Sequence, residues 1–474
     1  MDCFSGLKSI LPFLPISIST ISSSSLSHLA WPEEAESSLK NLKLGPTVSH
    51  VDSGAKLFDF ISKLRDELGF SSQPPLSFGA SNGFSIFFDQ HMSRDDAKAW
   101  FDEVIPDLAS LLLRLPSLLE AHYHKSNELS GNDKCELRIL GSQDAGIVIL
   151  NRELIAGLLA CAFLCLFPTK DRDSKHLPMI NFDQLFVTLV NGWRQSQHEK
   201  VKCFVHYFGR ICKDTPNGVV SFERKVLPSS PDAEFWKSSD TPLCPIKIFT
   251  SGSIEDQPHE ALEVIFSNEK FGGNSLNMGC VQEHIRFMIN PELVGGMLFM
   301  ASMGDNEAVE VVGVERYAQY TGYGSSFCFS GEYVDKKPVD SMEIRKTRIV
   351  AIDALNKPSR EQIYTKSLLR EVNKAFCGFK GSEYESNLVN LQKCKAPPED
   401  GKTAITRNSV CNEQEKGDDR ENRQAIANES DNASANANAN VGIATGNWGH
   451  DLTLQENIPF PALANAAKYT HKCH

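Results

Sequence analysis

The spacing of hydrophobic positions changes near residue 215, and this change predicts two kinds of structure in one chain. From residue 94 apolar side chains recur every three or four positions, as in "RDDAKAWFDEVIPDLASLLLRLPSLLEAHY", which is the period of an amphipathic helix. Further helices are predicted over "NRELIAGLLACAFLCLFP", "NFDQLFVTL" and "SQHEKVKCFVHYFGRI". Residues 90–212 are therefore predicted to form a helical accessory domain, with residues 1–90 as its N-terminal extension.

After residue 215 short runs rich in Val, Ile and Phe alternate with helical patterns. Strands are predicted over "GVVSFERKVL", "CPIKIFTSGSIE", "ALEVIFSN", "EAVEVVGVE" and "TRIVAIDAL". Helices are predicted over "VQEHIRFMI", "PELVGGMLFM" and "SLLREVNKAFCGF". Alternation of this kind favours a layered α/β domain, which we place at residues 213–380.

The pattern is lost beyond residue 380. Residues 381–440 are polar, charged and repetitive, with an Asn-Ala tract, and this composition is typical of a disordered insertion. Order is expected to return over residues 441–474, starting at "GIATGNWGHDLTL".

Charge and cysteine usage narrow the class of protein. The net charge of −12 argues against a protein that coats nucleic acid through a general basic surface, so no direct nucleic-acid partner is expected. The 13 cysteines include no CxxC pair, which favours reduced thiols in a nuclear or cytoplasmic protein and no metal site.

The apolar segments do not indicate a membrane protein. Leu154–Phe167 is too short to cross a bilayer, which takes about 20 apolar residues. The N-terminal segment is a poor secretory signal because Asp2 precedes the first basic residue and prolines interrupt the apolar run. An organelle transit peptide within residues 1–30 stays open as an alternative.

Candidate chemistry gathers in "KFGGNSLNMGCVQEHIRFMINPEL". Gly272 and Gly273 let the backbone approach a phosphate or a ribose closely. Gln282, Glu283 and His284 follow at a predicted helix start, where an amide can hold a sugar hydroxyl and a carboxyl can exchange a proton with a glycosidic oxygen.

This segment resembles the signature of the poly(ADP-ribose) glycohydrolase family, in which a glycine loop precedes Gln-Glu-Glu. Similar blocks occur in family order at "LLACAFLCLFP", "VKCFVHYFGRI", "TGYGSSFCFSGEY", "RIVAIDAL", "REVNKAFCGF" and "ATGNWG". The resemblance implies a macrodomain, which is an α/β/α sandwich with a mixed sheet, preceded by a helical accessory domain. It also implies hydrolysis of the ribose–ribose O-glycosidic bond of poly(ADP-ribose), with no cofactor.

The resemblance assigns roles to particular positions. Glu283 matches the first glutamate of the family pair. The positions expected to bind poly(ADP-ribose) or ADP-ribose are Ile254, Glu255, Asn268, Gly272, Gly273, Gln282, Tyr323, Asn447 and Gly449. Poly(ADP-ribosyl)ated proteins are expected partners, and the chain is expected to be a monomer.

Several positions depart from the family pattern. His284 stands where the family has its principal acid, the second glutamate. Ile265 replaces the family aspartate, and Asn274 replaces a third glycine. After "GNWG" the family continues with a further loop, helices and strands, so we expect the macrodomain to be C-terminally incomplete.

Two hypotheses follow. The first is a poly(ADP-ribose) glycohydrolase with catalysis impaired by Ile265, Asn274, His284 and the missing C-terminal loop. The alternative is a catalytically inactive ADP-ribose-binding pseudoenzyme or a truncated gene product. Outside the motif, His122 is expected at a solvated helix end, and Cys280 is not expected to be a nucleophile because no basic residue flanks it in the sequence.

Overall fold

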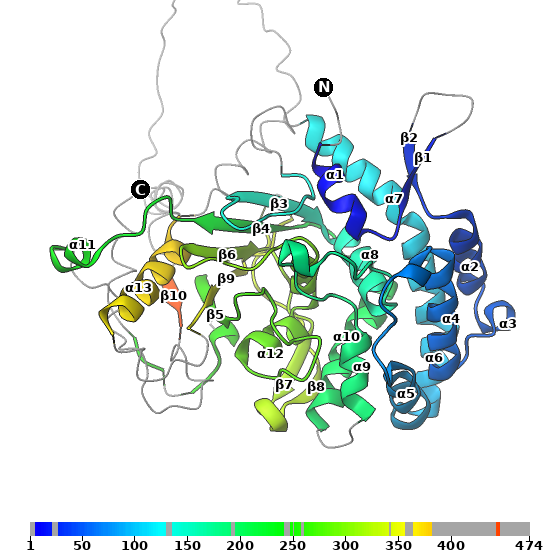
Figure 1. Ribbon diagram of the computed structural model, residues 1–474. Helices are drawn as coiled ribbons and strands as arrows, with labels where there is room; N and C mark the ends of the chain where they lie inside the picture. The colour runs from blue at the N-terminus through cyan, green and yellow to red at the C-terminus, as the bar shows by residue number, and fades with distance from the viewer. Residues whose placement is uncertain are drawn as a thin grey trace, which may run out of the picture.

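The computed structural model describes most of the chain that precedes the polar C-terminal segment (Figure 1). The described residues are 5–20, 27–128, 135–190, 195–240, 247–249, 251–256, 260–340, 343–355, 364–381 and 442–445. The predicted disordered insertion over residues 381–440 lies outside these ranges, apart from residue 381.

The α-helices of the described residues lie mostly in the N-terminal half of the chain. They are α1 Ser5–Ile10, α2 Glu33–Lys43, α3 Pro46–Ser49, α4 Gly54–Glu67, α5 Ala80–Ser85, α6 Arg94–Ala99, α7 Ile105–Glu128, α8 Arg152–Phe163, α9 Asp183–Val190, α10 Gln195–Lys213, α11 Ala233–Lys237, α12 Gln282–Ile289 and α13 Thr365–Phe379. The predicted helices of residues 90–212 are thus present, and residues 1–90 add helices α1 to α5 on one side of the molecule (Figure 1).

The strands form one large sheet and two small hairpins. They are β1 Ser17–Thr20, β2 Ser27–Ala30, β3 Gly146–Asn151, β4 Val219–Val226, β5 Ala261–Ser267, β6 Glu307–Val312, β7 Ala318–Thr321, β8 Cys328–Glu332, β9 Arg348–Asp353 and β10 Gly442–Ala444. The six-stranded sheet has the order β10-β5-β9-β6-β4-β3. Strands β10, β5 and β9 are parallel, and the remaining pairs are antiparallel, so the sheet is mixed.

Two predicted elements differ from the structure, and strands β1, β2, β3, β7, β8 and β10 were not predicted. The run "PELVGGMLFM" forms a 3-10 helix over Pro291–Leu298, since two adjacent glycines and an N-terminal proline disfavour a regular α-helix. The described part of "CPIKIFTSGSIE" contains a 3-10 turn at Ile254–Asp256 and no strand. Strand β3 lies inside the range predicted to be helical, yet it pairs with β4 at the edge of the sheet.

Apolar layers cover both faces of the sheet. On one face Ile265, Phe287 and Val311 belong to a core that extends into the N-terminal helices. On the other face Val264 and Val350 pack in a smaller core with residues of α13. The result is an α/β/α sandwich whose first helical layer is continuous with the helical domain, so α10 lies close enough to reach the loops at the sheet edge.

The described residues contain neither a candidate membrane-spanning helix nor a candidate metal site. None of the helices there combines the length and apolar character that crossing a membrane requires. In the same part of the chain, no group of three or more His, Cys, Asp and Glu is placed to hold a metal ion.

Candidate functional site

The loop after β5 and the start of α12 place the predicted motif at the carboxyl end of the parallel strands. Ser267, the last residue of β5, pairs in register with Asp353, the last residue of β9. Ligands of α/β sheets bind in the crevice beyond the carboxyl ends of strands. Gln282, Glu283 and His284 form the first turn of α12.

Glu283 is a buried carboxyl held by three donors. Oε1 accepts hydrogen bonds from Ser267 Oγ at 2.6 Å and from the Gly272 N–H at 3.0 Å. Oε2 accepts from the Asn268 N–H at 3.1 Å. Burial raises the pKa of Glu283 to about 8, even though all three hydrogen bonds act to lower it. The side chain is therefore mostly protonated at neutral pH.

Ser267 allows Glu283 to exist in either protonation state. The Ser267 hydroxyl also lies 2.9 Å from the carbonyl oxygen of Asn268. When Glu283 is protonated, this hydroxyl can turn to donate to that carbonyl and accept the carboxyl proton of Glu283. Sequence analysis missed Ser267, although it lies between Ile265 and Asn268 in a segment that was already singled out.

The two predicted glycines occupy positions that a side chain would not tolerate. Gly272 has φ 84°, and a Cβ there would lie 2.7 Å from the Phe287 ring. Gly273 has φ 44°, and its Cβ would lie 2.9 Å from Glu283 Oε2. The Gly272 N–H binds Glu283, so in this structure the close approach serves the buried carboxyl.

His284 stands between two backbone donors. The Asn274 N–H points at Nε2 over 3.2 Å, and the Val281 N–H points at Nδ1 over 3.1 Å. A neutral imidazole accepts at one nitrogen only, because the other carries the proton. One of the two N–H groups is therefore left without an acceptor. A carboxylate accepts at both oxygens and would satisfy both, as glutamate does at the third position of a helix.

The electrostatics of His284 oppose its protonation. Burial lowers the pKa of His284 to about 3, and the nearby ammonium of Lys200 contributes in the same direction. Nε2 lies 3.8 Å from Glu283 Oε2. At neutral pH the ring is uncharged, so an imidazolium is not present to protonate a departing oxygen.

Gln282 and Tyr323 meet at the open edge of β5. The Gln282 side chain accepts from the Phe266 N–H at 2.9 Å and donates to the Val264 carbonyl at 2.9 Å. The Gln282 N–H donates to Tyr323 Oη at 3.3 Å, and the Tyr323 side chain is 48% exposed. Tyr323 thus presents a ring that a base or a sugar can reach, next to the first turn of α12.

Glu255 lies near Arg286, which is one turn further along α12 than Gln282 and Glu283. Tyr320 Oη donates to Glu255 Oε1, and Arg286 Nη1 lies 3.7 Å from Oε2. Ile254 precedes it in the same 3-10 turn and is half-buried. The structure therefore connects this pair to α12 through Arg286.

Two of the departures have clear surroundings. Ile265 is 1% exposed and packs in the main core, so an aspartate there would be buried among apolar groups. The Asn274 side chain is exposed, and its φ does not fall in the positive range. Asn447 and Gly449, predicted to start the diphosphate loop, lie outside the described residues.

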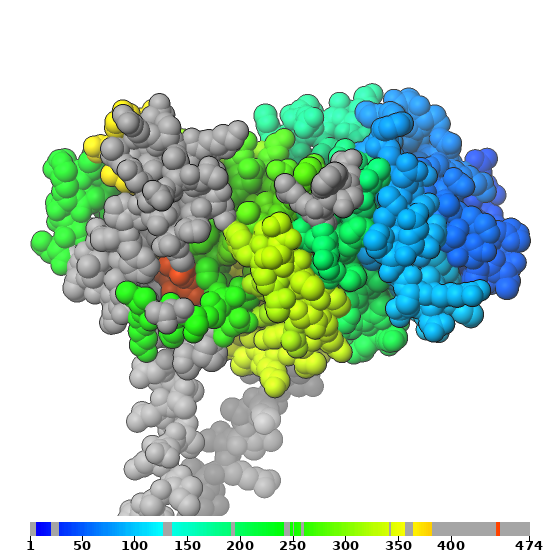
Figure 2. Space-filling model, turned by 90° about the horizontal axis from the view of Figure 1, so that it is seen from below, coloured from blue at the N-terminus to red at the C-terminus, as the bar shows by residue number. Residues whose placement is uncertain are grey.

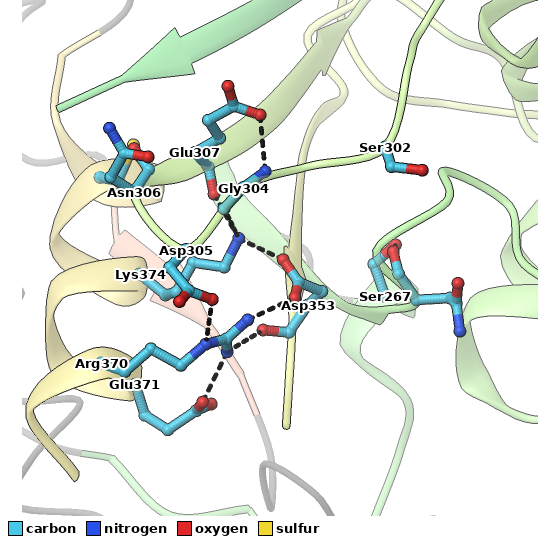
Figure 3. Close-up of polar contacts among 12 residues, drawn as sticks. Ser267, Ser302, Gly304, Asp305, Asn306, Glu307, Asp353, Arg370, Glu371 and Lys374 are labelled. Carbon is cyan, nitrogen blue, oxygen red and sulfur yellow. Dashed lines mark hydrogen bonds and ion pairs between the residues drawn. The ribbon is translucent and has the colours of Figure 1, made fainter. Parts of the chain in front are cut away.

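A cluster of ionic side chains lies beside the site at the end of β9 (Figure 3). Arg370 and Lys374 of α13 hold Asp353, with Arg370 Nη2 2.6 Å from Oδ2 and Lys374 Nζ on Oδ1. Lys374 Nζ also donates to the carbonyls of Gly304 and Glu307, each at 2.7 Å. Figure 3 shows that Ser267 lies across from this cluster.

Two expectations outside the motif need correction. His122 is only partly exposed: its Nε2 accepts from the Leu137 N–H at 2.8 Å, and burial lowers the pKa of His122 to about 4. Cys280 does have a basic neighbour in space, since Lys200 acts to lower its pKa. Burial outweighs Lys200 and raises the pKa of Cys280, so the thiol is still no activated nucleophile.

Comparison with known families and proteins gives consistent matches. A family model described as the macro domain fold of poly(ADP-ribose) glycohydrolase matches residues 233–453. A second, described as the helical domain of the same enzyme, matches residues 92–224. Fold and loop geometry thus define a macro-domain protein with an attached helical domain.

Similar proteins lead to the family itself. Poly(ADP-ribose) glycohydrolase 1 of Arabidopsis thaliana is 46% identical over 464 residues, which cover 95% of this chain and 83% of that protein. Probable poly(ADP-ribose) glycohydrolase 2 of the same plant is 43% identical over 468 residues, with the same coverage. Poly(ADP-ribose) glycohydrolase 1 of Caenorhabditis elegans is 34% identical over 194 residues, or 38% of this chain and 25% of its own. The chain belongs to the poly(ADP-ribose) glycohydrolase family.

Proposed function

We propose that the chain binds ADP-ribose units of poly(ADP-ribose) and hydrolyses the ribose–ribose O-glycosidic bond more slowly than a relative with two adjacent glutamates. The observation that carries this proposal is Glu283, a buried and protonatable carboxyl held by Ser267, Asn268 and Gly272. Family membership supports the choice of substrate.

The chemistry needs a proton for the departing oxygen and a water that attacks the oxocarbenium-like centre. Glu283 is protonated at neutral pH, because burial raises its pKa to about 8. His284 supplies no proton, because burial lowers its pKa to about 3. Loss of one positioned acid typically reduces a rate about 10²- to 10⁴-fold, which is the expected scale of impairment.

Ile265 and Asn274 are proposed to impair catalysis as well. Ile265 places a buried apolar side chain where the family has a carboxylate. The Asn274 side chain occupies the exposed surface of the loop beside His284, where a third glycine would leave space.

A second candidate is a binding protein without turnover. It is favoured by the arrangement around His284, in which the ring leaves one backbone N–H without an acceptor and offers no acid. In this case the glycine loop, Tyr323 and Glu255 would still recognise ADP-ribose.

The test combines a rate assay on labelled poly(ADP-ribose) with calorimetry on ADP-ribose. Turnover that is slow in the wild-type protein and vanishes in Glu283→Ala supports the hydrolase. Binding without turnover supports the second candidate, and neither binding nor turnover would refute both. Glu234→Ala, an exposed glutamate on α11 that pairs with Lys237, is the matched control and should behave as wild type.

Three further expectations remain proposals with simple tests. Size-exclusion chromatography with light scattering should give one chain per particle. Pull-down with poly(ADP-ribosyl)ated protein should depend on the polymer. Fractionation of cells should find the protein in the nucleus, the cytoplasm or both.

A further inference from the structure

Three successive carbonyls of the signature loop point at one helix of the helical domain. Lys200 Nζ donates to the carbonyls of Asn277 and Gly279, the latter at 2.6 Å. Gln197 Nε2 donates to the Met278 carbonyl between them, at 3.2 Å. Both donors belong to the first turns of α10, which Figure 1 shows beside α12.

Three neighbouring carbonyls that point the same way need several hydrogen-bond donors close together. The oxygens of residues 277–279 bring their negative ends together, and a buried carbonyl left unpaired costs about 1–3 kcal/mol. An ammonium carries three donors and a full charge, so one group can satisfy two carbonyls at once. Lys200 is fully buried, and its Nζ lies within hydrogen-bond distance of two of the three carbonyls.

The loop that Lys200 binds contacts residues of the candidate site. Gly279 lies against His284, since a Cβ at Gly279 would be 2.5 Å from the ring. The Gly279 N–H donates to the Asn274 carbonyl at 3.0 Å, and the Asn274 N–H faces His284. The next carbonyl, that of Cys280, accepts from the Gly324 N–H at 3.0 Å.

The first turns of α10 also contact strand β8. Glu199 Oε2 accepts from the Phe329 N–H at 3.2 Å and so contacts β8. The β7–β8 hairpin projects from the surface in Figure 2, and the segment between its strands carries Tyr323. Helix α10 thus contacts both the loop at residues 277–279 and the β7–β8 hairpin.

We propose that Lys200 is a positioning residue, through which the helical domain sets the shape of the loop that holds the ribose next to the bond to be cut. The inference rests on the proposed function for the identity of the ligand, ADP-ribose. It goes beyond that function because it assigns part of the site to a helix that carries none of the signature residues.

The test is Lys200→Met, which keeps the length of the side chain and removes its donors. The matched control is Lys213→Met, an exposed lysine at the other end of α10. Loss of two hydrogen bonds from a charged donor should weaken ADP-ribose binding about 10-fold or more. AMP, which lacks the second ribose, should bind both variants as it binds wild type.

A spectroscopic readout examines the loop without any ligand. The chain contains two Met-Gly pairs, at Met278-Gly279 and Met303-Gly304. Labelling with carbonyl-¹³C methionine and ¹⁵N glycine therefore isolates two amide signals. Lys200→Met should shift the Gly279 signal and leave that of Gly304 unchanged, because the Gly304 N–H donates to Glu307 Oε2 at the far cluster.

The outcomes separate the inference from the function. Unchanged ADP-ribose affinity with an unchanged Gly279 signal overturns the proposal, as does an equal loss of AMP binding. If wild type binds no ADP-ribose, the proposed function fails and the Gly279 signal alone decides the role of Lys200. If Lys200→Met does not fold, Gln197→Ala takes its place: weaker ADP-ribose binding with unchanged AMP binding supports the proposal, and unchanged ADP-ribose binding overturns it.

Discussion

Two buried carboxyls lie at the carboxyl ends of neighbouring parallel strands and are treated in opposite ways. Asp353, at the end of β9, is held by the cations Arg370 and Lys374 (Figure 3). Glu283, beside the end of β5, is held by a hydroxyl and two backbone N–H groups. Among the described residues, no lysine or arginine lies within ion-pair distance of Glu283; His284 alone does.

The partners of these two carboxyls indicate different roles: Asp353 has a structural role, and Glu283 is the candidate for proton transfer. Arg370 and Lys374 connect α13 to the sheet through Asp353. Glu283 has hydrogen-bond donors but no cation partner among the described residues, and burial raises the pKa of Glu283 to about 8 although those donors act to lower it. In the cluster around Asp353, burial also raises the pKa of Glu371, to about 7, although its partner Arg370 acts to lower it.

The largest expected effect concerns the transferable proton. Glu283→Ala should reduce the turnover of poly(ADP-ribose) about 10²- to 10⁴-fold, because it removes the one protonated carboxyl beside the glycine loop. A fluorescence or radiolabel assay of released ADP-ribose measures this loss. An unchanged rate would show that another group supplies the proton.

The second prediction addresses the scaffold cluster. Lys374→Met leaves Asp353 and two carbonyls short of a donor, so the free energy of unfolding should fall by about 3 kcal/mol. Urea denaturation measures this, with Lys366→Met, an exposed lysine of the same helix, as a control within about 0.5 kcal/mol of wild type. A loss of ADP-ribose affinity without loss of stability would contradict the scaffold role.

The third prediction restores an acceptor. His284→Glu offers two oxygens to the Asn274 and Val281 N–H groups and adds a carboxyl next to Glu283. Turnover should rise about 10-fold, which is less than the 10²- to 10⁴-fold typical of one general acid, and stay below that of a two-glutamate relative because Ile265 remains. A full recovery would show that Ile265 matters little, and no gain would show that the ring is not the defect.

The smallest effect is a pH dependence of stability. The pKa of His284 is lowered by burial from 6.5 to about 3, so the unfolded chain binds the proton more tightly. Its contribution to stability is complete above pH 6.5 and is lost as the pH falls toward 3. At pH 5.5 the wild-type protein should have lost about 1 kcal/mol more than His284→Gln, as measured by urea denaturation at each pH.

The sequence predicted the outline of this fold and the segment of the site, since both depend on local patterns. Strands β4, β5, β6 and β9 and helices α12 and α13 all lie in runs with the expected period. Strand β3 was missed because six residues beside a long apolar helix give a weak signal, and its pairing with β4 is a tertiary fact. The environment of the site could not be predicted at all.

Lys200 illustrates why. It lies three and four residues before Cys203 and Phe204, on the stripe of α10 that is buried, and a charged residue in that stripe was a signal that could have been noticed. Its partners are almost 80 residues away in sequence, at Asn277 and Gly279. The two donors that face His284 are likewise a product of loop geometry.

The most direct test of the central claim is the titration of Glu283 itself. Carboxyl-¹³C glutamate spectra, recorded from pH 4 to pH 9 and compared with Glu283→Gln to assign the signal, report the pKa of this side chain. Burial without a cation partner predicts a midpoint near 8 for Glu283. A midpoint at or below the ordinary 4.5 would contradict this prediction, because Glu283 would then hold no proton at neutral pH.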